Sequence, residues 1–274
     1  AGIVADGAGN AANFTALSLS ADVVVTLDAP RTIGILNFGD QNAPPHRWFL
    51  QSGTGGALTF AGTSPTVAVL GAPTTIAAPI HGPAGLTKVG GGKLILGAAG
   101  TLGGAITVNA GTLAVEDPLT GTNLTVRSGA TLSGNGSITC PVVIQAGGTI
   151  APGGDDPGTL TLQNTLTLAG TARFRVAKTG ISLVYDQLGG IGNLTCGGTL
   201  IVTNTGAWPL EAGDTLTLFS AAAHTGAFAN LILPPLPSPL AWDTAHLVRN
   251  GSLAVINATN APVIIRPPDN LTVI

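Results

Sequence analysis

The chain has 274 residues, which suffices for one elongated domain or two compact ones. Charged residues make up only 8 % of it and the formal net charge is −3, so it lacks the basic surface of a nucleic-acid-binding protein. Gly, Thr, Ser and Pro interrupt every apolar stretch before it reaches the roughly 18 residues of a membrane span. We therefore expect neither a nucleic-acid partner nor membrane insertion. No signal peptide is recognisable at Ala1, so we expect that the chain was processed or trimmed.

Short strands are predicted along the whole chain. Residues 1–80 show less regular strands around the segment Pro44-Pro45-His46-Arg47-Trp48. Farther on, Leu alternates with Thr, as in 160–162 and 166–168, with the period of two that is typical of a β-strand. The 40 glycines can supply turns that need a positive φ, whereas long runs of helix formers at helical spacing are missing. These features predict an all-β chain.

A loose internal repeat indicates how the strands are arranged. In each copy a turn of small residues leads into a strand in which aliphatic residues alternate with Thr or another residue. The copies are 92–96, 110–115, 128–132, 146–150, 157–162, 197–202 and 212–218. Such repeats predict a solenoid of stacked coils, with aliphatic side chains pointing inward and hydroxyls outward. At roughly 20–25 residues per coil, about 11–13 coils are expected.

The segments 85–96 and 103–115 carry a specific resemblance. They read Gly-Leu-Thr-Lys-Val-Gly-Gly-Gly-Lys-Leu-Ile-Leu and Gly-Gly-Ala-Ile-Thr-Val-Asn-Ala-Gly-Thr-Leu-Ala-Val. Together they resemble the bacterial autotransporter-associated β-strand repeat, although 98–102 lacks that family's usual polar stretch with an aromatic residue. The resemblance implies a right-handed parallel β-helix, exported to the surface or exterior of a Gram-negative-type bacterium.

The flanking segments extend the resemblance. The segments 148–153, 185–188 and 213–219 are similar to turns and C-terminal pieces of the same large surface proteins. We therefore expect a β-solenoid over residues 1–256, less regular in 1–80 and with the repeat motif in 85–115. Residues 231–242 form a Pro-rich extended connection, and 257–274 form a linker or connecting tail.

No catalytic, cofactor or metal site is predicted. The adjacent acidic pairs Glu116-Asp117 and Asp155-Asp156 both precede Pro, which favours turns over catalysis, with a weak calcium contact as the alternative. The four histidines lack metal-ligand spacing; they are His46, His81, His224 and His246. Arg173 and Arg175 are expected to share one outer strand face, either solvated or in contact with an acidic neighbour or a polysaccharide.

Cys140 and Cys196 are the two cysteines of the chain. An exported protein sits in an oxidising compartment, where they can form a disulfide. Between two and three coils separate them, however, so a bond requires coils of uneven length. A disulfide and two free thiols both remain open.

The tail contains two short apolar pieces, Val263-Ile264-Ile265 and Leu271-Thr272-Val273-Ile274. No amphipathic helix is recognisable at either terminus, so both ends of the solenoid are expected to be open. Strand addition of the tail to a neighbouring subunit would satisfy such an end. The alternative is that the tail leads into a following domain of a longer protein.

Two functions are compatible with these features. The first is a non-enzymatic structural or adhesive module, a subunit or segment of a bacterial surface fibre or matrix that self-associates end to end. Its partners would be further copies, a polysaccharide or a cell surface. The alternative is a carbohydrate-binding or carbohydrate-active β-helix, which one Tyr and three Trp do not favour.

Overall fold

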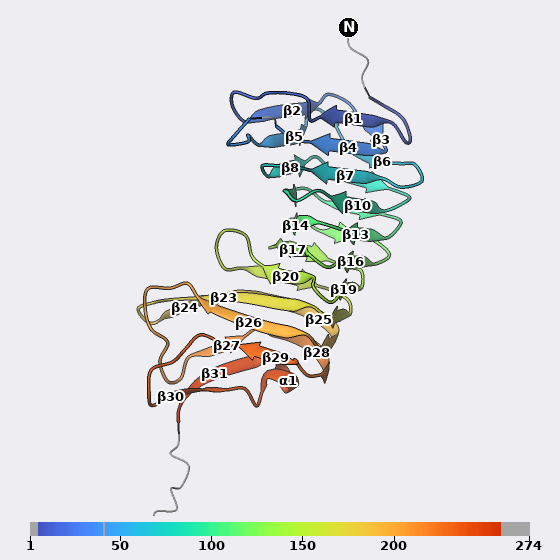
Figure 1. Cartoon of the computed structure of the whole chain (residues 1–274). Coiled ribbons are helices and arrows are strands. Elements are labelled where there is room, and N and C mark those ends of the chain that lie inside the picture. The colour runs from blue at the N-terminus through green and yellow to red at the C-terminus, as the bar shows by residue number, and fades with distance from the viewer. Residues whose placement is uncertain (1–4, 41, 259–274) are drawn as a thin grey trace, which may run out of the picture.

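The computed structural model describes residues 5–40 and 42–258 of the chain. It confirms the predicted all-β solenoid: short strands stack as successive coils from the N-terminal to the C-terminal end (Figure 1). Three parallel ladders of strands form three faces around a common core. We call them the first, second and third face.

The first face contains ten strands among the described residues, each paired in parallel with the next. They are β1 (Ala11–Phe14), β4 (Ile35–Phe38), β7 (Thr66–Val69), β10 (Leu86–Val89), β13 (Ile106–Val108), β16 (Leu124–Val126), β19 (Val142–Ile144), β22 (Leu166–Leu168), β25 (Gln187–Cys196) and β28 (Phe219–Gly226).

The second face is built from shorter strands and merges with the first at β25, which pairs with strands of both faces. Its members are β3 (Arg31–Ile33), β6 (Leu58–Phe60), β9 (Ile80–Gly82), β12 (Gly100–Leu102), β15 (Leu119–Thr120), β18 (Ser137–Ile138) and β21 (Thr159–Leu162).

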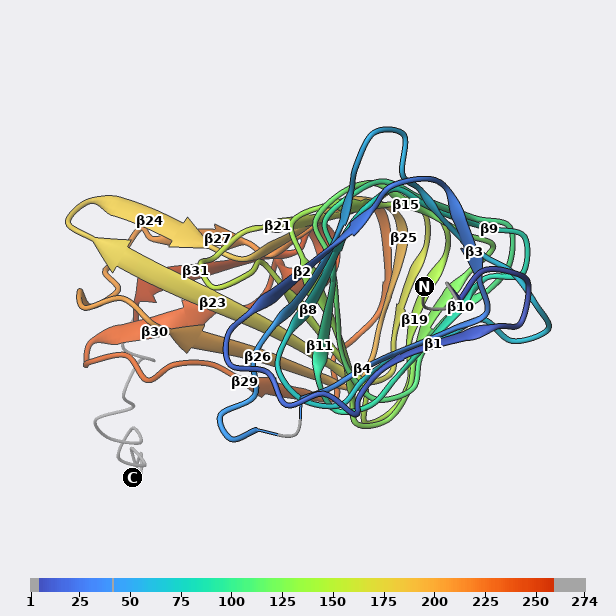
Figure 2. The ribbon, with the colours of Figure 1, turned by 90° about the horizontal axis from the view of Figure 1, so that it is seen from above.

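The third face contains most strands of the sequence repeat. It consists of β2 (Val23–Leu27), β5 (Trp48–Ser52), β8 (Thr74–Ala77), β11 (Lys93–Leu96), β14 (Gly111–Val115), β17 (Ala130–Gly134), β20 (Thr149–Pro152), β23 (Thr171–Thr179), β26 (Thr199–Asn204) and β29 (Asn230–Ile232). The β24 strand (Ser182–Tyr185) pairs antiparallel with β23. The resulting hairpin projects away from the coils (Figure 2).

Coil length varies along the chain. Paired positions on the first face are 24, 31, 21, 20, 18, 18, 24, 28 and 30 residues apart. The shortest coils coincide with the repeat motif, and the longest of all lies in the irregular region 1–80. The first-face ladder has fewer coils than the predicted 11–13, because the chain beyond β28 and β29 no longer coils.

The core is a continuous aliphatic column. On the first face, one inward position is occupied in successive strands by Leu86, Ile106, Leu124, Val142, Leu166 and Leu194, each at most 2 % exposed. Aromatic rings concentrate toward the two ends. Phe14, Phe38 and Trp48 form one cluster, and Phe174, Phe219 and Phe228 form the other.

Glycines with positive φ lead into the third-face strands, as the repeat predicts. Gly111 at the start of β14 has φ +66°, a conformation that residues with a side chain rarely adopt. A Cβ atom there would lie 2.5 Å from the carbonyl oxygens of Gly90 and Gly92 in the preceding coil. The small-residue turn is therefore required by the close stacking of coils.

The C-terminal end has a cap, contrary to the expectation of an open end. β27 (Thr215–Thr217), β31 (Ser252–Asn257) and β30 (Leu240–Asp243) form an antiparallel sheet, accompanied by the one-turn helix α1 (Leu247–Asn250) (Figure 1). Leu216, Leu247 and Leu253 of the cap are at most 2 % exposed. The sequence did not reveal this cap because its helix is one turn long and its strands are discontinuous in the chain.

The predicted Pro-rich connection lies between β29 and the cap. Residues 233–239 are extended, whereas 231–232 and 240–242 belong to strands at either side. Lys178 on β23 fastens the hairpin to the chain before β27, since its Nζ lies 2.9 Å from Glu211 Oε2 and 2.9 Å from Asp214 Oδ2. The hairpin and the cap are therefore joined by a nearly buried cation.

Candidate functional site

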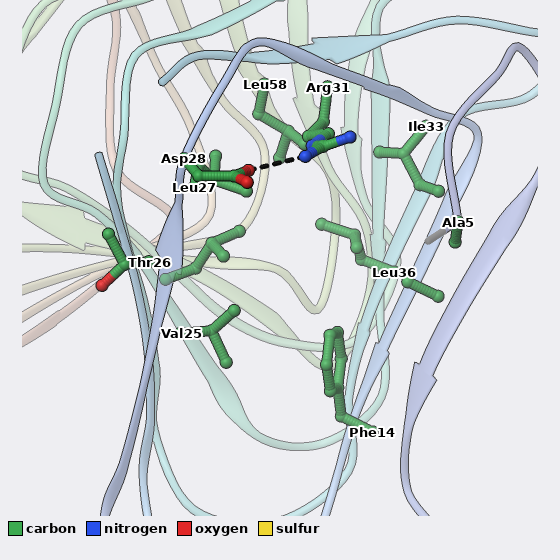
Figure 3. Close-up of a pocket in the computed structure, with 12 residues that line it drawn as sticks. Ala5, Phe14, Val25, Thr26, Leu27, Asp28, Arg31, Ile33, Leu36 and Leu58 are labelled. Atoms are coloured by element: carbon green, nitrogen blue, oxygen red, sulfur yellow. Dashed lines mark hydrogen bonds and ion pairs between the residues drawn. The ribbon is translucent and has the colours of Figure 1, made fainter. Parts of the chain in front are cut away.

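An apolar cavity of about 450 Å³ lies at the N-terminal end of the core (Figure 3). Its lining comes from the first coils: Ala5, Ala12, Phe14, Val25, Thr26, Leu27, Asp28, Arg31, Ile33, Leu36, Leu50 and Leu58. Asp28 and Arg31 form an ion pair at 2.6 Å within this lining. Within the described part of the chain, β1, β2 and β3 each pair with one neighbouring strand, so one edge of each is unpaired. This end thus exposes both apolar surface and backbone hydrogen-bonding groups.

Lys88 is completely buried in the core of the repeat motif. It occupies an inward position between Val67 and Val108 of the adjacent coils. Its Nζ donates hydrogen bonds to the carbonyl oxygens of Val89 at 2.8 Å, Gly90 at 2.8 Å and Ala110 at 3.2 Å. Burial lowers the pKa of Lys88 to about 8. This side chain therefore links two coils from inside the core.

Arg175 and Asp186 form a buried junction beside the third face. Arg175 Nε donates to Asp186 Oδ2 at 2.9 Å, and Nη2 donates to Oδ1 at 3.0 Å. The same guanidinium reaches the carbonyl oxygens of Asp155 and Asp156, each at 2.7 Å. Asp186, only 1 % exposed, also accepts from the backbone N–H of Gly158 at 2.9 Å. Hydrogen bonding to Asp186 raises the pKa of Arg175.

This junction forms one side of a hollow on the outer surface of the third face. The hollow has a volume of about 290 Å³ and is lined by Lys93, Thr112, Ser133, Ala151, Pro152, Gly153, Gly154, Arg173, Arg175 and Asp186. We call it the basic hollow, since three of the chain's ten Lys and Arg residues line it. Arg173 and Arg175 do share the outer face of β23, but Arg175 is bound by Asp186 and Arg173 is exposed.

The acidic pairs lie in turns, as the following prolines indicated. Glu116-Asp117 lies between β14 and β15, and Asp155-Asp156 lies between β20 and β21. Glu116 Oε2 accepts hydrogen bonds from the backbone and side chain of Asn135, each at 3.2 Å. The loop of Asp155 and Asp156 is held through its carbonyl oxygens by Arg175. The turn interpretation is therefore confirmed.

The four histidines lie apart in the fold. His46 Nδ1 is 2.8 Å from Asp40 Oδ2 in the loop before β5. His81 is on β9, His224 on β28 and His246 just before α1. The described residues contain no group of three or more His, Cys, Asp or Glu side chains arranged to hold a metal ion.

Cys140 and Cys196 are both free and buried. Burial raises the pKa of both thiols, that of Cys196 to about 11. The pairing register explains why the structure does not bring them together. Cys196 lies two strands farther along the first face, level with Ile144 rather than with Cys140. A separation of two strand steps, about 10 Å, exceeds the Cα distance that a disulfide spans.

The predicted tail strands 263–265 and 271–274 lie outside the described residues. Nearer the cap, an apolar groove of about 420 Å³ is lined by β26, β29 and the Pro-rich connection. None of the described helices is long and apolar enough to cross a membrane.

Comparison with known proteins gives one informative match. No family model matches the chain. The chain is 28 % identical over 237 residues to the adhesin BmaC autotransporter of Brucella suis biovar 1 (strain 1330), an alignment that covers 81 % of this chain. The chain spans only 7 % of the length of that adhesin. The chain is thus similar to a short part of a long bacterial autotransporter adhesin.

Proposed function

We propose that this chain is a non-enzymatic adhesive segment of a bacterial surface protein, exposed at the cell surface or outside the cell. The observation that carries the proposal is the similarity to an autotransporter adhesin across four fifths of the chain. The solenoid is consistent with it, since stacked coils present long outer surfaces on a rigid core.

The outer surfaces are suited to polar contacts. On the first face one outward column contains Thr66, Thr87, Thr107, Thr125, Val143, Thr167, Thr195 and Thr225. On the third face another contains Thr112, Thr131, Thr149, Thr171 and Thr199. Strand stacking spaces these hydroxyls about 4.8 Å apart. Repeated weak hydrogen bonds along such columns would favour contact with an extended partner.

Bead retention under flow tests the adhesive role. Beads coated with the folded chain should remain on epithelial cells or polysaccharide-coated surfaces in at least severalfold greater number than beads coated with heat-denatured chain. Equal retention would contradict adhesion. Polysaccharide cleavage that is abolished by Asp155→Asn together with Asp156→Asn would contradict the non-enzymatic role.

We further propose that the segment associates end to end, as a subunit or part of a surface fibre. The N-terminal cavity and the unpaired edges of β1, β2 and β3 support this, because an apolar strand could be added there. The tail pieces 263–265 and 271–274 are the proposed strands that a neighbouring copy would donate. A partner coil seated on the cavity would bury its apolar lining.

Sedimentation velocity over a concentration series tests this association. Deletion of 259–274 leaves β31 and the cap complete, and Val25→Lys places a charge in the cavity. Each change should convert larger species into monomers. A truncated chain that assembles like the full chain would exclude the tail as the connector, and a monomeric full chain would exclude self-association.

A further inference from the structure

The basic hollow brings together residues that are far apart in the sequence. Lys93 is paired with Thr112 on the neighbouring strand of the third face. Ser133 is paired with Ala151, and Ala151 is level with Arg173 on the following strand. Small side chains therefore lie between two long cationic ones. This sequence of sizes makes a shallow depression with a positive charge toward each end.

The charges in the hollow do not cancel. Arg175 is neutralised by Asp186, as the ion pair at 2.9 Å shows. Lys93 and Arg173 have no carboxylate partner within the described ranges 5–40 and 42–258. Asp155 and Asp156 lie on the adjacent loop but are not part of the lining. The lining thus carries two uncompensated positive charges in a chain whose net charge is −3.

Ser133 gives an independent indication of a ligand. Its side chain lines the hollow and the residue is only 8 % exposed. Its Oγ has no hydrogen-bond partner among the residues that the structure describes. A buried hydroxyl without a partner is unfavourable, and a ligand oxygen in the hollow would satisfy it.

We propose that the basic hollow binds an acidic sugar unit of a polysaccharide. A carboxylate would sit between Arg173 and Lys93, where charge-assisted hydrogen bonds are strongest. Sugar hydroxyls would bond to Ser133 and Thr112, and the neighbouring sugars would follow the threonine column of the third face. This rests on the proposed adhesive function and names the chemical class of its target.

Other polyanions fit the hollow less well. Nucleic acids are bound by extended basic surfaces with aromatic rings for base stacking, whereas no aromatic residue lines this hollow. An acidic peptide would match the charge but would not use the column of outward hydroxyls. Both polymers serve as comparison ligands in the test.

The test measures binding of the full chain to oligogalacturonate by biolayer interferometry. Its fully methyl-esterified form has the same sugars without charge and serves as the neutral ligand. Binding should favour the acidic form at least tenfold and weaken with added salt. Arg173→Gln should reduce affinity about tenfold or more, Lys93→Gln and Ser133→Ala severalfold. The matched control is Arg127→Gln, an exposed Arg on another part of the coils.

Several outcomes would overturn the proposal. These are equal binding of the neutral ester, unchanged affinity in Arg173→Gln, or tighter binding of DNA or poly-glutamate through the same residues. If beads are retained on cells but oligogalacturonate does not bind, the hollow proposal fails and the adhesive function stands. If beads are not retained at all, the adhesive function fails.

Discussion

At the scale of single residues, Lys88 shows where sequence reasoning stops. Alternation in β10 places Lys88 on the same side as the buried Leu86, but a charged residue would be expected to face solvent. The structure resolves the conflict through three carbonyl oxygens that receive its ammonium group. These acceptors come from turns in two coils, and a pattern of residue types does not reveal them.

The lowered pKa of Lys88 predicts a specific pH dependence. Between about pH 8 and the ordinary Lys pKa of 10.5, the unfolded chain holds more protons than the folded one. The free energy of unfolding should therefore rise with pH in this window through Lys88, and lie at its lowest contribution below pH 8. Lys88→Met should abolish this component and cost about 1–3 kcal/mol at neutral pH, because three carbonyl oxygens lose their donor.

Urea unfolding of both proteins from pH 7 to 10.5 provides the measurement. The difference between the two curves isolates Lys88 from the cysteines, whose raised pKa values act in the opposite direction. A difference that does not change with pH would show that Lys88 keeps its proton throughout.

Gly111 allows a second residue-scale prediction. Gly111→Ala should destabilise the fold by about 1–3 kcal/mol, because a Cβ atom there meets two carbonyl oxygens and φ is positive. Gly91→Ala is the matched control, since nothing lies within 4 Å of its Cβ position. Equal midpoints for the two variants in urea would contradict the close stacking at this turn.

At the scale of elements, the repeats predicted strands well and the additions to the solenoid poorly. Strands such as β11, β14 and β17 follow directly from alternation after a small-residue turn. The β23–β24 hairpin was not predicted because nothing local distinguishes β24 from a strand that continues the coil. Its position depends on Asp186, whose four hydrogen bonds join segments far apart in the chain.

Removal of the Asp186 carboxylate should have a large effect. Asp186→Ala leaves the Arg175 guanidinium without its partner, and breaking such a buried pair costs about 3–5 kcal/mol. Asp156→Asn should be nearly neutral, because Arg175 contacts the backbone carbonyl of Asp156. Thermal unfolding and limited proteolysis of the 153–158 loop report both effects. Similar stability of the two variants would contradict the role assigned to Asp186.

At the scale of the whole molecule, the fold class could be predicted from composition and repeats. The basic hollow and the C-terminal cap could not, because both depend on which coils become neighbours. Coils of 18 to 31 residues make that register impossible to count from the sequence alone. The same uneven coils place Cys140 and Cys196 apart, an arrangement that spacing left open.

The parallel register of the third face is the claim on which this account depends most. Thr131 and Thr149 are 18 residues apart in sequence but are direct partners on β17 and β20. Their Cα atoms should be about 4.8 Å apart, within the range of a disulfide. Thr112 and Thr149 are two strand steps apart, about 10 Å, and provide the control pair.

Both pairs can be replaced by Cys in a background in which Cys140 and Cys196 are changed to Ala. After mild oxidation, peptide mass spectrometry should find a disulfide within one chain for the 131/149 pair and none for the 112/149 pair. Failure of the 131/149 pair to cross-link, or equal cross-linking of both pairs, would contradict the stacked register and with it the basic hollow.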